Sequence, residues 1–143
     1  MAFLVKTDLK TGADPAIIDK LINSDLTILE GSEGIIAQSI ALMKGYLSKY
    51  YDIEAIFSTT GANRHLTVLK HLKSIVTFEV FLRTNRDPGK ALQMKNDEAM
   101  KWLENLNTGE FFDKTLPREV IAPDAVDTSK MGFGSNKKYD SRY

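Results

Sequence analysis

The sequence predicts a mainly α-helical protein, a compact bundle of about four helices with an extended C-terminal arm. Apolar residues recur at spacings of three or four through residues 15–106, and helix-breaking residues cluster between the periodic stretches. From residue 111 onward no apolar period lasts for more than a few residues. A chain of 143 residues is long enough for one domain with a buried core. We therefore assign residues 1–110 to a helical domain and residues 111–143 to the arm.

The first predicted helix begins at Asp14-Pro15, which combines a capping aspartate with a proline at the first helical position. It ends at residues 23–25. Residues 26–30 alternate in polarity like a strand, but the run is too short to assign, and we interpret it as a connector.

The second helix follows residues 31–34, where Ser32 is the expected N-cap. Small residues near its apolar face predict close approach of a neighbouring helix, and residues 52–57 predict one further turn before a loop at 58–61. The apolar stripe itself consists of Ile36, Ile40, Met43, Leu47 and Tyr50, and the small residues are Ala37, Ala41 and Gly45.

The third helix is predicted from residue 65 to about residue 83, with Asn63 as its cap. Its apolar residues cover well over half of the circumference, which is typical of the central helix of a domain. The breakers Pro88 and Gly89 separate it from a fourth helix over residues 90–106. Asn107-Thr108-Gly109 predicts a left-handed stop for that last helix.

Charge and cysteine content exclude several function classes. Lys+Arg and Asp+Glu number 19 each, a balance that argues against a dedicated nucleic-acid binder and against a polybasic membrane anchor. The absence of cysteine excludes disulfides, thiolate nucleophiles, Cys-ligated zinc and iron–sulfur clusters. No segment resembles a signal peptide or a membrane-spanning helix, so we expect a soluble cytoplasmic protein.

The candidates for chemistry are few, and we expect no catalytic residues, no cofactor and no metal. His65 and His71 are six residues apart, so on a helix they face different directions, and we interpret each as a surface or helix-boundary histidine. The loops at residues 31–34 and 59–63 lack the spacing of a nucleotide-binding loop and are interpreted as plain turns.

Charged and aromatic residues on the helices have structural interpretations. Asp97 and Glu98 predict a solvated face paired with Lys95 and Lys101. Glu79 lies inside the apolar third helix, and we expect it to pair with Arg83, the alternative being a basic residue on another helix or subunit. The aromatic residues Tyr46, Tyr50, Tyr51 and Trp102 are interpreted as core or interface side chains rather than as a platform for bases.

Three stretches resemble the small neck proteins of phages and prophages, the head–tail connector or head-completion proteins of the phage Mu type. Residues 37–50, AQSIALMKGYLSKY, are similar to that family's helix with small residues, Ile and a Tyr-Leu-x-basic-Tyr end. The long apolar helix at 65–83 with its following NRDP is the second stretch, and AMKWLENLNTGE at 99–110 is the third. FGSNKK at 133–138 is similar to the family's Gly-Ser-polar-basic tail. One departure lies in the first stretch, where Lys49 occupies a position at which the family commonly has Arg.

The resemblance implies a structural protein with no cofactor that assembles on the portal and joins the phage head to the tail. Its implied partners are the portal and other neck or tail proteins, in a homo-oligomeric ring that is compatible with a monomeric free subunit. DNA would pass nearby without sequence-specific binding, and no membrane is involved. The implied location is the host cytoplasm during assembly and then the virion.

The end of the arm is the candidate partner-binding segment. We expect aromatic anchors at Phe133, Tyr139 and Tyr143, with Lys137, Lys138 and Arg142 as charge partners. The alternative for this segment is a frayed terminus. Two other functions stay open: a cytoplasmic helical protein–protein interaction module, and an enzyme that uses a histidine with a carboxylate brought close by the fold.

Overall fold

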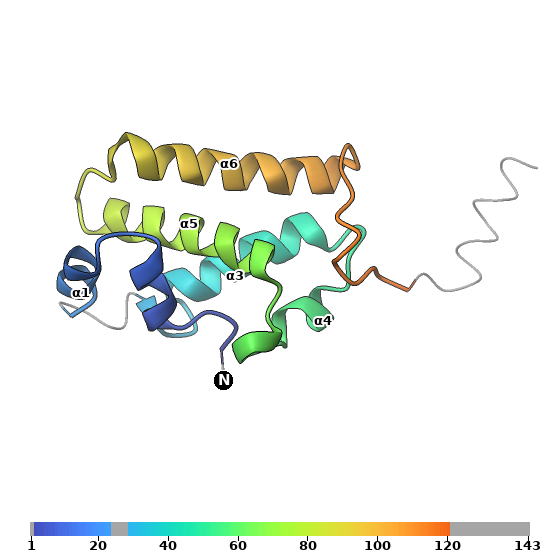
Figure 1. The fold of residues 1–143 in the computed structure, drawn as a ribbon, viewed down its shortest axis with the longest axis horizontal. Coiled ribbons are helices and arrows are strands. Elements are labelled where there is room, and N and C mark those ends of the chain that lie inside the picture. Colours follow the sequence, from blue (N-terminus) through green and yellow to red (C-terminus); the bar gives the residue numbers. More distant parts are fainter. Residues whose placement is uncertain (1, 24–28, 121–143) are drawn as a thin grey trace, which may run out of the picture.

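The computed structural model describes residues 2–23 and 29–120, and this part of the chain is mainly helical, which confirms the predicted fold class (Figure 1). Three long helices form its body, and the short elements lie before and between them. In chain order the elements are η1 (Lys6–Thr11), α1 (Pro15–Asn23), α3 (Ile35–Leu47), α4 (Ile53–Phe57), η2 (Gly61–Asn63), α5 (Leu66–Arg83) and α6 (Gly89–Thr108).

Helix α5 is the centre of the body, as its apolar circumference predicts. It packs against α6, against α3 and against η1, and α3 also contacts α6 (Figure 1). Its side chains Val68, Leu72 and Val76 have no exposed surface. Equally buried residues come from the neighbouring elements: Met43 and Leu47 of α3, Ala99, Leu103 and Leu106 of α6, and Leu9 of η1.

Several helix ends follow local sequence signals. Asp14 Oδ1 accepts a hydrogen bond from the Ala16 N–H at 2.9 Å, as the predicted opening of α1 requires. Asp52 caps α4 in the same way by accepting from the Ala55 N–H at 3.0 Å, so the expected extra turn is confirmed. Gly109 adopts the left-handed conformation, with φ of 81°, and ends α6.

Two predicted caps are wrong. Gly34, not Ser32, is the N-cap of α3. Residues 31–34 form a turn that is closed by the hydrogen bond from the Gly34 N–H to the Gly31 carbonyl, so the helix begins only after Gly34. His65, not Asn63, caps α5, because residues 61–63 form η2 and the helix therefore begins at Leu66. The His65 Nδ1 accepts from the Val68 N–H at 3.4 Å.

Two of the three small residues of α3, Ala41 and Gly45, do not bring a neighbouring helix close, contrary to the prediction, and Ala37 is half-buried. Ala41 and Gly45 are exposed, and a Cβ placed on Gly45 would have no atom within 4 Å. The larger apolar residues of the helix are the ones turned inward, including Ile36, Met43 and Leu47. Their greater apolar area explains which face of α3 is buried.

The first part of the expected arm is packed on the helical body. The Asp52 N–H donates to the Pro117 carbonyl at 2.9 Å, and an isolated antiparallel bridge pairs Tyr51 with Arg118. Leu116 is buried in the core cluster. Residues 111–119 therefore continue the body, and the rest of the predicted arm, 121–143, lies outside the described residues, as does most of the connector at 26–30.

None of the helices in residues 2–23 and 29–120 combines the length and the apolar character that crossing a membrane requires.

Two glycines of opposite environment give a test of this packing. A Cβ on Gly34 would lie 2.5 Å from the Leu29 carbonyl oxygen, so Gly34→Ala should lower the free energy of unfolding by about 1–3 kcal/mol. Gly45→Ala, at an open position in the last turn of α3, should raise the free energy of unfolding by about 0.5–1 kcal/mol, because alanine has a higher helix propensity than glycine. Urea unfolding of both variants measures the two changes, and equal shifts would contradict the close approach at Gly34.

Candidate functional site

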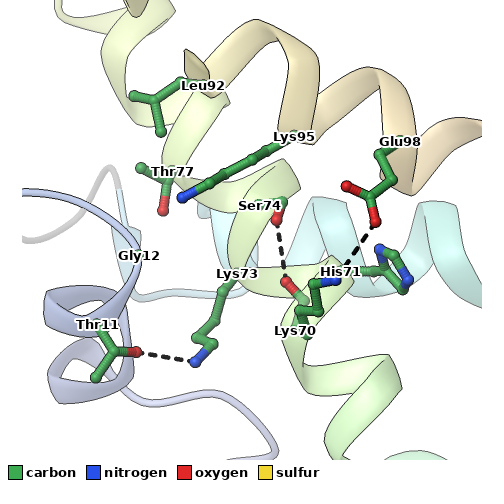
Figure 2. A pocket seen from close by; sticks show the side chains of 10 residues that line it. All are labelled: Thr11, Gly12, Lys70, His71, Lys73, Ser74, Thr77, Leu92, Lys95 and Glu98. Atoms are coloured by element: carbon green, nitrogen blue, oxygen red, sulfur yellow. Dashed lines mark hydrogen bonds and ion pairs between the residues drawn. The ribbon is translucent and has the colours of Figure 1, made fainter.

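A cavity of about 260 Å³ lies where η1, α5 and α6 meet (Figure 2). Helix α5 supplies the largest share of its wall, and on one face of α5 Lys70, Lys73, Ser74 and Thr77 follow one another at spacings of three, one and three residues. The other lining residues are Thr11 and Gly12 at the end of η1, His71 of α5, and Leu92, Lys95 and Glu98 of α6. We call this cavity the α5 pocket.

Cationic groups outnumber anionic ones in the α5 pocket. The Lys70 Nζ lies 3.3 Å from the Glu98 Oε1, an ion pair between α5 and α6 (Figure 2). The Lys73 Nζ donates to the Thr11 Oγ1 at 2.9 Å and so links α5 to η1. Lys95 makes neither a hydrogen bond nor an ion pair with another described residue. The pocket therefore presents uncompensated positive charge.

His71 is buried, with 5% of its surface exposed, so the prediction of a surface or helix-boundary histidine is wrong for this residue. Its ring stacks on Trp102 of α6, with 4.4 Å between ring centroids and 23° between planes. The physical reason is that α5 is covered by α6 at this position. Burial, together with the Lys70 charge, lowers the pKa of His71, and the Glu98 charge opposes the shift without cancelling it.

Thr77 contributes a buried hydroxyl without a partner. The residue is 1% exposed, and its Oγ1 has no hydrogen-bond partner within residues 2–23 and 29–120. A Cβ on Gly12 would lie 3.5 Å from this oxygen, so η1 closes over it at its C-terminal end. Buried hydroxyls of native proteins are usually hydrogen-bonded, which makes Thr77 an unexplained polar group in the wall of the pocket.

The wall contributed by η1 is held in place by an ion pair that no sequence pattern indicated. The Arg64 Nη1 lies 2.6 Å from the Asp8 Oδ2 and donates to the Phe3 carbonyl at 2.9 Å. Burial works to raise the pKa of Asp8. The hydrogen bonds from Arg64 and from the Val5 N–H, with the charges of Arg64 and Lys73, outweigh burial and hold that pKa below its usual value.

His65 lies at a helix boundary, as predicted. Besides capping α5, its Nε2 lies 2.6 Å from the Thr115 Oγ1, in hydrogen-bond contact with the C-terminal segment. The structure does not bring His65 and His71 to one site, since only His71 lines the α5 pocket. Among the described residues no group of three or more histidine or acidic side chains is arranged to hold a metal ion.

The expected charge pairs have other partners. Arg83 donates from Nη2 to the Gln38 Oε1 at 2.7 Å and makes no ion pair with Glu79 among the described residues, because α3 supplies a closer acceptor. Glu79 lies half-buried in a shallow cavity that Gln38 also lines. Glu98 pairs with Lys70 on α5 rather than with the lysines of its own helix.

The tyrosines have the packing role that was expected. Tyr51 is 1% exposed, and its hydroxyl accepts a hydrogen bond from the Asp113 N–H at 3.1 Å. Tyr50 packs edge-on against Phe112, with 5.4 Å between ring centroids. Both therefore hold residues 111–119 on the body. Tyr46 is half-buried against the core.

All six predicted partner-binding residues lie outside the described part of the chain: Phe133, Lys137, Lys138, Tyr139, Arg142 and Tyr143. Sequence reasoning did not find the α5 pocket, although the sequence contains a signal for it. Polar residues at 70, 73, 74 and 77 form one stripe on a helix that is mostly apolar.

Comparison with known proteins gives no match: neither a protein-family model, nor a curated protein, nor a solved structure is significantly similar to this chain.

The buried imidazole predicts a pH dependence of stability. Since the pKa of His71 is lowered in the folded state, the unfolded chain binds the extra proton first as the pH falls through the ordinary histidine pKa of about 6.5. The free energy of unfolding should therefore decrease from about pH 7.5 to about pH 5, and His71→Phe should remove that part of the decrease. His65→Gln is the matched control and should keep it. Urea unfolding across this range measures the effect, and equal profiles for wild type and His71→Phe would contradict it.

The unpartnered hydroxyl predicts a stabilising substitution. Thr77→Val keeps the shape of the side chain and removes a buried group that lacks a hydrogen bond, so the free energy of unfolding should rise by about 1 kcal/mol. Thr67→Val makes the same chemical change at a half-buried position of α5 and should alter stability by less than about 0.5 kcal/mol. Thermal unfolding in an anion-poor buffer compares the two variants. A destabilised Thr77→Val protein would mean that the hydroxyl has a partner.

Proposed function

We propose that this protein is a structural head–tail connector of a phage or prophage, an adaptor that assembles on the portal and joins head to tail without catalysing a reaction. One observation carries the proposal. The three stretches that resemble the connector family coincide with α3, with α5 and with the second half of α6, and these are the helices that pack on one another to form the body. The resemblance thus concerns the residues that determine the fold.

The position of the C-terminal segment supports the same function. Residues 111–119 are fixed on the body through Tyr50 and Tyr51, and the Glu119 N–H donates to the Tyr50 carbonyl at 3.2 Å. Val120, the last described residue, has 92% of its surface exposed. The end of the described chain is shown in Figure 1. A segment tethered at a fixed point has a high effective concentration at a neighbouring subunit, which suits the head-to-tail contacts of a ring.

A helical protein–protein interaction module is the second candidate function. The feature that favours it is an apolar cavity of about 440 Å³ between the N-terminal segment and α3, with Leu4, Leu29, Ile36 and Ile40 in its wall. A cavity of that size and lining accommodates apolar side chains of a bound peptide. This function predicts a stable monomer with no affinity for a portal.

Light scattering after size exclusion tests the connector function. The full-length protein should form a ring, or a complex with the portal protein of the same phage or prophage. A chain ending at Lys130, and a full-length variant with Phe133→Ala, Tyr139→Ala and Tyr143→Ala, should lose that large species at the same protein concentration, since their aromatic anchors are removed. Phe111→Ala, which removes a half-exposed aromatic side chain of the body, is the control and should assemble normally.

The two parts of the proposal fail in different ways. A full-length protein that remains monomeric with the portal present contradicts the connector function and favours the interaction module. Assembly that is unchanged in the two tail variants contradicts the role of residues 133–143 and leaves the connector function standing.

A further inference from the structure

We propose that the α5 pocket is a binding site for a phosphate-type oxyanion, with the Thr77 hydroxyl and the ammonium groups of Lys73 and Lys95 as its ligands. The inference is independent of the connector function, because it rests on the charge, the hydrogen-bonding groups and the size of the pocket (Figure 2).

The charge of the pocket favours an anion. Glu98 is paired with Lys70 at 3.3 Å. Asp8 of η1, whose pKa the Lys73 charge helps to lower, is paired with Arg64 at 2.6 Å. The ammonium groups of Lys73 and Lys95 are therefore left without a carboxylate of their own among the described residues. A free phosphate ion, which carries roughly two negative charges near neutral pH, would balance both lysines, and a phosphodiester would balance one of them.

The hydrogen-bonding groups favour an acceptor with several oxygens. The Thr77 Oγ1 is buried, unpartnered and part of the pocket wall, so it has an O–H to donate. Figure 2 shows the Thr77 hydroxyl and the Lys95 ammonium turned toward the same space between η1 and α6. Lys73 uses one donor on Thr11, and an ammonium has two more. Donors that come from both α5 and α6 suit a tetrahedral anion better than a single-point ion.

The size of the pocket limits the ligand. Its volume of about 260 Å³ is below the range of roughly 300–1,000 Å³ that is typical of sites for drug-sized molecules. One oxyanion fits such a space. The oxyanion could be free phosphate or a single phosphodiester of a nucleic-acid backbone, since both offer non-bridging phosphate oxygens as acceptors.

Amide NMR of the full-length protein with inorganic phosphate tests this site. Sodium phosphate is added at constant ionic strength, kept with sodium chloride, and saturable shifts are expected for the amides of Gly12, Ser74 and Thr77. Lys95→Gln, an exposed and therefore foldable variant, should weaken phosphate binding about tenfold or more, because a charge-assisted hydrogen bond is lost. Thr77→Val should weaken it as well. Lys101→Gln makes the same charge change at an exposed position of α6 outside the pocket and should bind phosphate like the wild type.

The possible outcomes separate clearly. Saturable shifts that both pocket variants weaken and Lys101→Gln retains support the site. Shifts that do not saturate, or equal binding by Lys95→Gln and wild type, overturn it. A short DNA duplex at the same ionic strength identifies the source of the oxyanion: displacement of phosphate by the duplex assigns the site to a phosphodiester, and no displacement assigns it to the free ion.

Discussion

Helix α5 has to be covered around most of its circumference, because its apolar residues occupy most of its faces. Val68, Leu72 and Val76 lose all of their exposed surface, and burial of each such side chain is worth about 1.5–3 kcal/mol. One neighbouring helix cannot cover them all. Helices α3 and α6 and the N-terminal η1 therefore pack around α5 together. The ion pair of Arg64 with Asp8 fixes η1 in that arrangement by joining it to the chain just before α5.

The same constraint explains why the polar residues of α5 form a pocket instead of a solvated face. Lys70, Lys73, Ser74 and Thr77 share one stripe, and the elements that cover the apolar residues on either side also enclose this stripe. Lysine side chains can extend out of such a position, but a threonine hydroxyl is too short to do so. Thr77 is consequently left in the wall without a partner, and the pocket keeps more positive than negative charge.

Local signals predicted much of the fold, and contacts between distant residues account for the rest. Asp14, Asp52 and Gly109 act through neighbours one to three residues away, so their roles at helix ends follow from sequence. The contact of His65 with Thr115 and the ion pair of Arg64 with Asp8 join residues 50 and 56 positions apart, and no periodicity encodes them. The burial of His71 depends likewise on Trp102 of α6. A polar stripe on an apolar helix was the one signal of the pocket in the sequence.

The proposed tail contacts and the α5 pocket would use different chemistry. The described chain ends at Val120, just after the bridge of Tyr51 with Arg118, whereas the α5 pocket lies beside η1 (Figure 1). Aromatic anchors in a tethered tail gain affinity from apolar burial, which salt affects little. Lysines around an oxyanion gain theirs from charge, which salt screens. Ionic strength would therefore separate the contributions of the two proposed interactions.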